Sequence, residues 1–124
     1  MPRYNDENII EACQALARVP SLRQQIQKAY PADAPRILQI LKLGEQLPDE
    51  FSGAYDLAVE VLVNEAPEVQ VFEAEQDKGV YQVTIRGFPG AYFVKAPEYD
   101  ASEVFVTKDQ ARSYIYENFG EFLH

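Results

Sequence analysis

The side chains that most often act as nucleophiles or proton-transfer groups are scarce in this sequence. The single histidine, His124, is the last residue, and terminal residues are commonly frayed. The single cysteine, Cys13, lies in an apolar helical stripe, which is typical of a small buried residue rather than a reactive thiol. We therefore expect no Ser–His or Cys–His pair, no zinc site and no catalytic residue.

Glycine and carboxylate patterns also give no cofactor or metal motif. Gly87 and Gly90 enclose Phe-Pro and predict a turn, whereas a P-loop or dinucleotide-binding loop needs a longer glycine pattern. Glu98, Asp100 and Glu103 could offer oxygen ligands to a hard cation, but their spacing matches no EF-hand loop. We interpret them as a solvated acidic loop and expect neither a metal nor a cofactor.

The charge balance favours some partners over others. The chain has 20 acidic and 11 basic residues, for a net charge of −9. Such a balance disfavours direct nucleic-acid binding, which depends on Lys and Arg, and it permits a basic protein partner. Tyr and Phe are concentrated in the second half, but without a basic footprint they predict a core rather than a base-stacking surface.

Sequence signals for a membrane or an export route are lacking. No apolar run approaches the roughly 20 residues that a membrane-spanning helix needs. The first residues become polar and acidic, so we expect no signal peptide. One cysteine cannot form an internal disulfide, and we therefore expect a cytoplasmic protein.

The second half of the chain predicts a β-hairpin. Residues 80–86 alternate between apolar and polar side chains, the pattern of a half-buried strand. Phe88-Pro89-Gly90-Ala91 fits a type II turn, with proline and glycine at its central positions. This turn predicts a register in which the following residues pair across the hairpin: Phe88 with Ala91, Gly87 with Tyr92, Arg86 with Phe93, Ile85 with Val94, and Thr84 with Lys95.

A preceding strand, residues 69–76, is expected on the other side of residues 80–87. A two-residue turn at Lys78-Gly79 would place Phe72 and Ala74 over Ile85 and Val83, and would turn Glu73 and Glu75 outward. A three-residue turn ending at Gly79 would bury both glutamates, which is costly for unpaired carboxylates. We therefore favour the first register.

Helix signals are found at both ends of the chain. Thr107 and Gln110 form a capping box for a closing helix that runs to Phe119 and ends at Gly120, after a short strand around Val104 and Val106. In the first half, Pro20 ends one helix, Ser21 can cap the next, and Gly44 can end the third. The predicted helices cover residues 5–19, 22–30, 33–44 and 49–64. The last of these also alternates as a strand would, and its length favours a helix.

These elements predict an α+β fold, with an N-terminal layer of three to four helices, a small antiparallel sheet and a C-terminal helix. We expect one domain, residues 1–124, with a helical part at 1–66 and a sheet part at 67–124. Each part is marginally stable alone, so we expect one shared core.

The remaining candidate for function is the sheet face turned away from the C-terminal helix. Aromatic and Arg side chains are enriched at interaction hot spots, and we expect Phe93 to be exposed there beside Arg86. The candidate partner-binding residues are Glu73, Glu75, Arg86, Phe93 and Lys95. Our leading hypothesis is a non-catalytic protein-interaction or regulatory protein with an acidic surface.

Two alternatives remain open. One is a small-molecule-binding protein or a histidine-independent enzyme, with a Tyr- and carboxylate-lined pocket between the helices and the sheet. The other is an acidic nucleic-acid mimic that inhibits a basic protein, which requires the acids to lie on one face. A strand at either edge of the sheet could also pair with a second copy of the chain, and residues 91–95 are the edge that we favour for such pairing.

Overall fold

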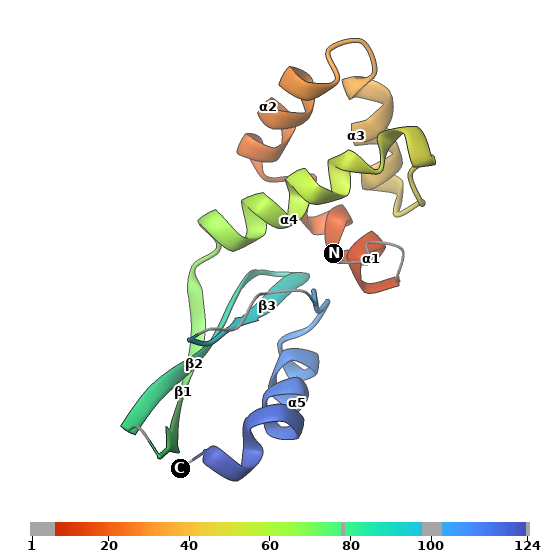
Figure 1. Cartoon of the computed structure of the whole chain (residues 1–124). Coiled ribbons are helices and arrows are strands. Elements are labelled where there is room, and N and C mark those ends of the chain that lie inside the picture. The colour runs from red at the N-terminus through yellow and green to blue at the C-terminus, as the bar shows by residue number, and fades with distance from the viewer. Residues whose placement is uncertain (1–6, 78, 98–102, 124) are drawn as a thin grey trace.

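The computed structural model describes residues 7–77, 79–97 and 103–123. Within these residues the chain forms a layer of four α-helices, a three-stranded antiparallel sheet and a final helix, which confirms the α+β class. Figure 1 shows the helical layer at one end of the molecule and the sheet with the final helix at the other. None of the helices in this part of the chain is long and apolar enough to cross a bilayer. In chain order the elements are α1 (Glu7–Leu16), α2 (Pro20–Ala29), α3 (Ala34–Leu43), the 3₁₀ turn η1 (Asp49–Phe51), α4 (Gly53–Glu65), β1 (Glu68–Gln76), β2 (Gly79–Phe88), β3 (Ala91–Lys95), α5 (Lys108–Phe119) and the 3₁₀ turn η2 (Gly120–Phe122).

The ends of the helices follow the predicted signals only in part. Gly44 ends α3 in a left-handed conformation with a φ of 71°, as predicted. Pro20 does not end a helix. It is the first residue of α2, where its fixed φ suits the helix and its missing N–H has no helical partner to lose. Ser21 therefore does not cap α2, and its hydroxyl donates a 2.6 Å hydrogen bond to the Glu65 carboxylate at the end of α4. Leu43, the last residue of α3, is exposed.

The ambiguous segment that follows is helical. In α4, Tyr55, Ala58 and Leu62 are buried at helical spacing, and Val63, the next residue along the helix, is exposed. The Tyr55 hydroxyl accepts a 2.7 Å hydrogen bond from the Leu47 backbone N–H, which fixes the connection from α3 against α4. Burial on one helical stripe therefore outweighs the β propensity of the valines, a common tertiary override of local preference.

The β2–β3 hairpin has the predicted register. Phe88 pairs with Ala91 and Thr84 pairs with Lys95, with every pair between them as expected. Gly90 has a φ of 95°, the left-handed value that the second central position of a type II turn requires. The Pro-Gly signal was sufficient here because a tight turn fixes the register of both strands.

The β1–β2 register differs from the prediction, but the faces are correct. Phe72 pairs with Val83 and Gln76 pairs with Gly79, so two residues, 77 and 78, separate the strands. The prediction placed the turn at residues 78 and 79, one residue too late in the sequence. Each residue of β1 therefore pairs with a β2 residue two positions earlier than predicted. A shift of two preserves the alternation of side chains, so Glu73 and Glu75 still point away from α5.

The capping box of α5 is confirmed. The Gln110 backbone N–H donates to the Thr107 hydroxyl at 3.1 Å, and the Gln110 side-chain oxygen accepts from the Thr107 N–H at 3.4 Å. The helix ends at Phe119, but Gly120 has right-handed helical dihedrals and continues into η2. The short strand predicted before Thr107 is a single antiparallel bridge between Phe105 and Tyr92.

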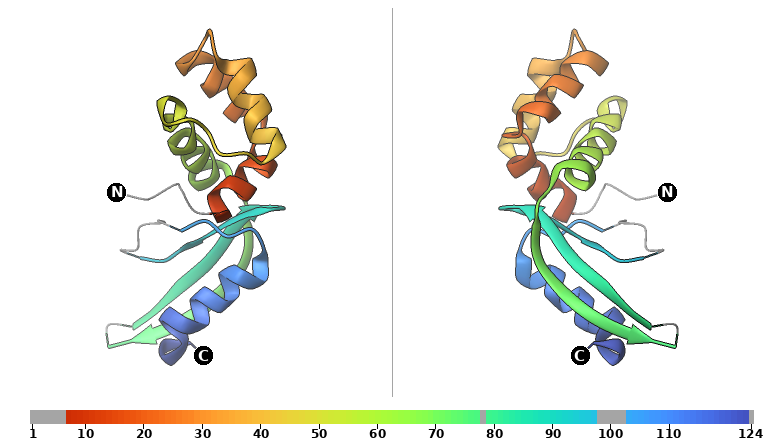
Figure 2. Two further views of the ribbon diagram at one scale, coloured as in Figure 1. Left: turned by 90° about the vertical axis from the view of Figure 1, so that its right-hand side faces the viewer. Right: turned by 90° about the vertical axis from the view of Figure 1, so that its left-hand side faces the viewer.

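Two hydrophobic clusters replace the single shared core that we expected. One joins the four N-terminal helices to Ala91, Phe93 and Val104, and the other joins the sheet to α5. Strand β3 contributes to both, because alternate residues point to opposite faces: Phe93 enters the helical cluster and Val94 enters the sheet cluster. Figure 2 shows the resulting arrangement, with α5 along one side of the sheet and the helices beyond its end.

The predicted exposure of Phe93 is therefore wrong. Its side chain is only 1% exposed, since α1 and α4 pack against β3 and cover that end of the sheet. Strand alternation correctly placed Phe93 on the face opposite α5. Alternation could not show that the helical layer covers part of that face.

Candidate interaction surface

The outer face is defined here as the side of the sheet opposite α5. Cross-strand pairing arranges its side chains in rows that run from β1 through β2 to β3. The rows, in order from the helical layer outward, are Glu68–Arg86–Phe93, Val71–Thr84–Lys95, Glu73–Gln82 and Glu75–Val80. Acidic residues therefore follow β1, and the two basic residues lie on β2 and β3.

Arg86 lies in the row next to the helical layer, and its guanidinium forms a long ion pair. Its guanidinium approaches the Glu68 carboxylate at 3.8 Å, and its side chain is 30% exposed. Its Nε is buried and has no hydrogen-bond partner in the described part of the chain. A long, partly exposed ion pair of this kind contributes little to stability, so Arg86 keeps donor capacity for another acceptor.

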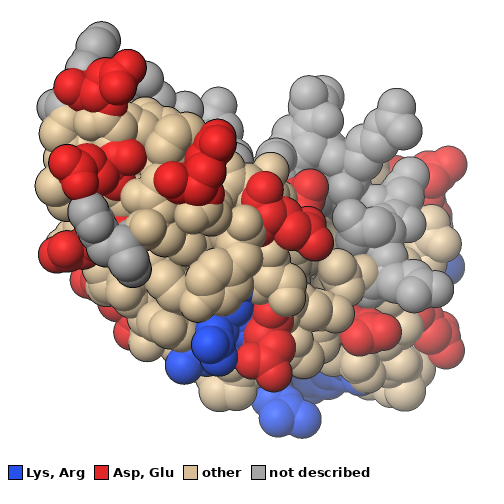
Figure 3. All heavy atoms as spheres, turned by 90° about the horizontal axis from the view of Figure 1, so that it is seen from below, with Lys and Arg blue, Asp and Glu red and all other residues tan. Residues whose placement is uncertain are grey.

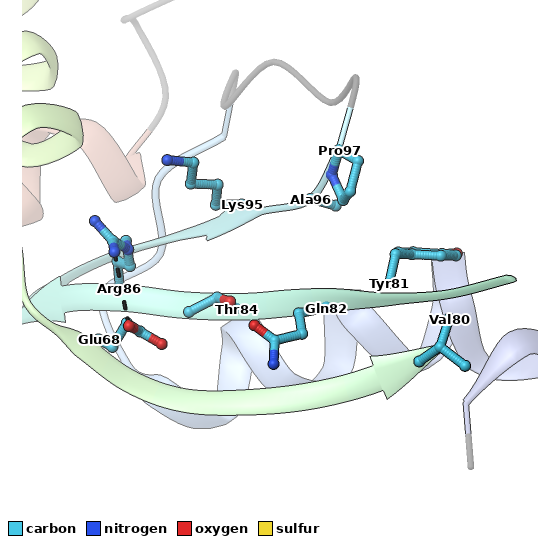
Figure 4. A pocket seen from close by; sticks show the side chains of 9 residues that line it. All are labelled: Glu68, Val80, Tyr81, Gln82, Thr84, Arg86, Lys95, Ala96 and Pro97. Carbon is cyan, nitrogen blue, oxygen red and sulfur yellow. Dashed lines mark ion pairs between the residues drawn. The ribbon is translucent and has the colours of Figure 1, made fainter. Parts of the chain in front are cut away.

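A groove of about 500 Å³ opens around this arginine. Figure 4 shows Arg86 on β2 and Lys95 on the neighbouring strand β3, with both side chains on the same side of the sheet. Thr84 and Gln82 follow Arg86 outward along β2. Thr84 is buried, whereas Gln82 and Lys95 are exposed. The residues lining the groove are Glu68, Val80, Tyr81, Gln82, Thr84, Arg86, Lys95, Ala96 and Pro97.

Apolar side chains complete the outer face. Val80 is 61% exposed and Val71 is 42% exposed, and Val69 on β1 is also exposed. Glu73 lies in the row next to that of Val71, and Glu75 pairs with Val80, so both glutamates lie on the face that the sequence predicted, although their cross-strand partners differ. The outer face therefore combines exposed apolar groups with charges of both signs.

Four of the five predicted partner-binding residues lie on this surface. Arg86 and Lys95 meet at the groove, Glu73 and Glu75 follow β1 farther from the helical layer, and Phe93 is buried beneath the helices. Sequence reasoning missed Val80, although its even spacing from Gln82 indicated the outer face. It also missed Glu68, since a β-bulge between Glu68 and Gln70 changes the alternation there.

Both edges of the sheet are partly closed. Tyr92 and Phe105 exchange two backbone hydrogen bonds of 2.8 Å at the β3 edge, and Leu123 bridges to Ala74 at the β1 edge. The predicted homodimer through residues 91–95 would have to form beside the Tyr92 bridge. These contacts reduce the length of each edge that can pair with another strand.

Two other grooves lie away from the outer face. One, near the β2–β3 turn, is lined by Glu11, Gln14, Ala15, Arg18, Lys42, Gly90 and Val106. The other, of about 450 Å³, follows α5 and is lined by Asn8, Glu103, Phe105, Asp109, Gln110, Ser113, Tyr114 and Glu117. Glu98 and Asp100 of the predicted acidic loop lie outside the described residues. Among the residues described, no group of His, Cys, Asp or Glu is arranged to hold a metal ion.

Acidic side chains are spread over more than one face. Figure 3 shows that Asp and Glu predominate on the side seen from below, with Lys and Arg toward one margin. Glu73 and Glu75 belong to the outer face, whereas the exposed Glu117 belongs to α5 on the other side of the sheet. This distribution does not favour the nucleic-acid mimic, which stays a prediction.

Two groups with a shifted pKa, the Cys13 thiol and the Tyr55 hydroxyl, lie in the helical cluster. Cys13 is fully buried, and burial raises the pKa of its thiol to about 12. Burial also raises the pKa of the Tyr55 hydroxyl, although the hydrogen bond from Leu47 opposes part of that rise. The thiolate is the reactive form of cysteine, so Cys13 is suited to packing rather than to nucleophilic attack.

Comparison with known proteins adds no assignment to this geometry. No protein-family model matches the sequence, and no curated protein and no solved structure is significantly similar to it.

Proposed function

We propose that this chain is a non-catalytic protein-interaction protein whose outer face binds a polypeptide segment of a partner. The observation that carries the proposal is that two valines are exposed on this face, Val71 beside Glu73 on β1 and Val80 in the groove that holds Arg86 and Lys95. The segment has one apolar side chain that packs on Val71, another that packs on Val80, and a basic side chain that faces Glu73 and Glu75.

The magnitudes favour a mixed apolar and charged partner. The exposed fractions of Val71 and Val80 together equal about one valine side chain, and burying one valine contributes about 1.5 kcal/mol. Apolar contact alone would therefore bind weakly. The net charge of −9 attracts a basic segment and accelerates its association, and Glu73 and Glu75 fix its position.

A peptide selection with matched variants tests the proposal. A displayed library of random peptides is selected on the full chain, and the enriched clones are measured against two variants. Val80→Lys changes the outer face, whereas Leu43→Lys changes an equally apolar, exposed residue on α3. We expect clones that combine apolar and basic residues, with binding lost to Val80→Lys and retained by Leu43→Lys.

Two results would contradict the proposal. Enriched clones that bind Val80→Lys as well as the unchanged chain would place the binding surface elsewhere. A selection without enriched clones would show that the face does not bind polypeptide segments.

The groove along α5 supports a second candidate function, the binding of a cationic small molecule. Tyr114 lies there beside Glu103, Asp109 and Glu117, a combination similar to the Tyr- and carboxylate-lined pocket expected from the sequence. A thermal-shift screen of cationic metabolites tests it. A compound that raises the Tm of the unchanged chain but not of Glu117→Gln supports this function, and the lack of any such compound contradicts it.

A further inference from the structure

Positive and negative side chains lie mostly on different parts of the outer face. The groove collects two basic side chains, Arg86 and Lys95, against one carboxylate, Glu68, although the whole chain carries −9. Arg86 pairs with Phe93 and Lys95 with Thr84, so the two cations are diagonal neighbours on one face of the hairpin. Figure 4 shows both side chains projecting to the same side.

These cations keep unused binding capacity. Lys95 forms no ion pair with any described residue, and the one ion pair of Arg86 there is the 3.8 Å contact with the half-exposed Glu68. A guanidinium has five N–H donors, and the partial burial of this one restricts its orientation. Thr84, which is buried in the floor of the groove, adds a hydroxyl between the two cations.

We propose that this groove binds a carboxylate group of the partner segment. This inference rests on the proposed function and names the chemistry of one contact within it. The planar guanidinium of Arg86 matches the two oxygens of a carboxylate, and Lys95 adds a second charge from the neighbouring strand. Glu68 already forms a long ion pair with Arg86, so a carboxylate of the partner would compete with Glu68 for the guanidinium.

The same chemistry can come from an acidic side chain or from the C-terminus of the partner chain. The segment therefore carries both signs of charge: a carboxylate at Arg86 and Lys95, and a basic side chain over Glu73 and Glu75, which lie in the next two rows outward. This spacing sets the orientation of the segment on the outer face, because reversing it would place like charges together.

A titration of the full chain with acetate, followed by amide and arginine Nε–H NMR signals, tests the groove directly. Sodium chloride at equal ionic strength is the reference. We expect saturable shifts of the Arg86 Nε–H and of the Thr84 and Lys95 amides that chloride does not reproduce. Arg86→Gln should weaken acetate binding about tenfold, the effect of losing one charge-assisted hydrogen bond.

Arg112→Gln is the matched control. Arg112 also has a buried Nε without a hydrogen-bond partner among the described residues, and it forms an ion pair with Asp109 at 3.6 Å, but it does not line the groove. Its substitution should leave acetate binding unchanged. Glu68→Gln removes the competing carboxylate and should tighten acetate binding, which keeps the test informative if Arg86→Gln unfolds the chain.

Two further probes separate the sources of the carboxylate. N-acetylalanine carries a chain-terminal carboxylate, and N-acetylaspartate N-methylamide carries a side-chain carboxylate, and the tighter binder identifies the source. Acetate shifts that equal those of chloride, or that survive Arg86→Gln, would overturn the inference. If acetate fails while selected peptides still lose binding to Val80→Lys, the groove assignment falls and the proposed function stands. If acetate binds the groove as expected but the selected peptides bind Val80→Lys as well as the unchanged chain, the groove assignment stands and the proposed function falls.

Discussion

Phe93 and Val80 belong to the same face of the sheet but differ in how far their side chains are exposed. Phe93 is sealed under the helical layer, and Val80 is 61% exposed. Phe93→Ala should lower the free energy of unfolding by about 3–5 kcal/mol, because it leaves a cavity between β3 and the helices. Urea unfolding measures the change, with Val80→Ala as the control that should lose less than about 1 kcal/mol. A loss below about 1 kcal/mol for Phe93→Ala would contradict the packing described.

Cys13 gives a pH-dependent prediction at the same scale. Burial raises its pKa from the ordinary 9.0 to about 12, so the folded chain holds the thiol proton more tightly than the unfolded chain does. This contribution to stability is fully present below pH 9 and is lost as the pH rises toward 12. The unfolding free energy should therefore fall by about 1.4 kcal/mol per pH unit more steeply in this range than it does for Cys13→Ala. Equal slopes in urea unfolding at several pH values would contradict the prediction.

At the scale of elements, local signals predict structure best where one short motif determines it. The Pro89-Gly90 turn and the Thr107–Gln110 capping box both form as the sequence indicates. The β1–β2 turn lacks so strong a signal, and its register was predicted two residues away from the real one. The start of α2 was missed because proline can end one helix or begin the next, and only packing decides between these roles.

The α5 cap offers a test at this scale. Thr107→Ala removes the hydroxyl that accepts from the Gln110 N–H at 3.1 Å and should cost about 1 kcal/mol of stability. Thr107→Ser keeps the acceptor and should recover most of that loss. Thermal unfolding of both variants measures the difference. If Thr107→Ala and Thr107→Ser were equally stable, the capping box would not stabilise this helix.

At the scale of the whole molecule, the sequence predicts the elements but not which surfaces they cover. Strand alternation placed Glu73, Arg86, Phe93 and Lys95 on one face, and the structure agrees with that grouping. The packing of α1 and α4 over Phe93 depends on contacts between distant segments, which no local pattern encodes. The face of the candidate site was therefore predictable, whereas Val80 was missed and the helical cover over Phe93 could not be predicted.

The net charge of −9 gives a prediction at this scale. Association of a selected basic peptide should slow as salt rises from about 0.05 to about 0.5 M, because screening weakens the attraction over longer distances. Dissociation, which depends on the buried contacts with Val71 and Val80, should change less. Stopped-flow binding at several salt concentrations measures both rates. Association that is independent of salt would show that the acidic surface does not attract the segment.

The most direct test of binding at the outer face is calorimetric titration of one selected peptide into three proteins. These are the unchanged chain, Val80→Lys and Leu43→Lys. Binding through the outer face predicts a Kd at least about tenfold weaker for Val80→Lys, and a Kd within about twofold of the unchanged chain for Leu43→Lys. Equal affinity for Val80→Lys and the unchanged chain would contradict it, and would remove the outer face as the binding surface.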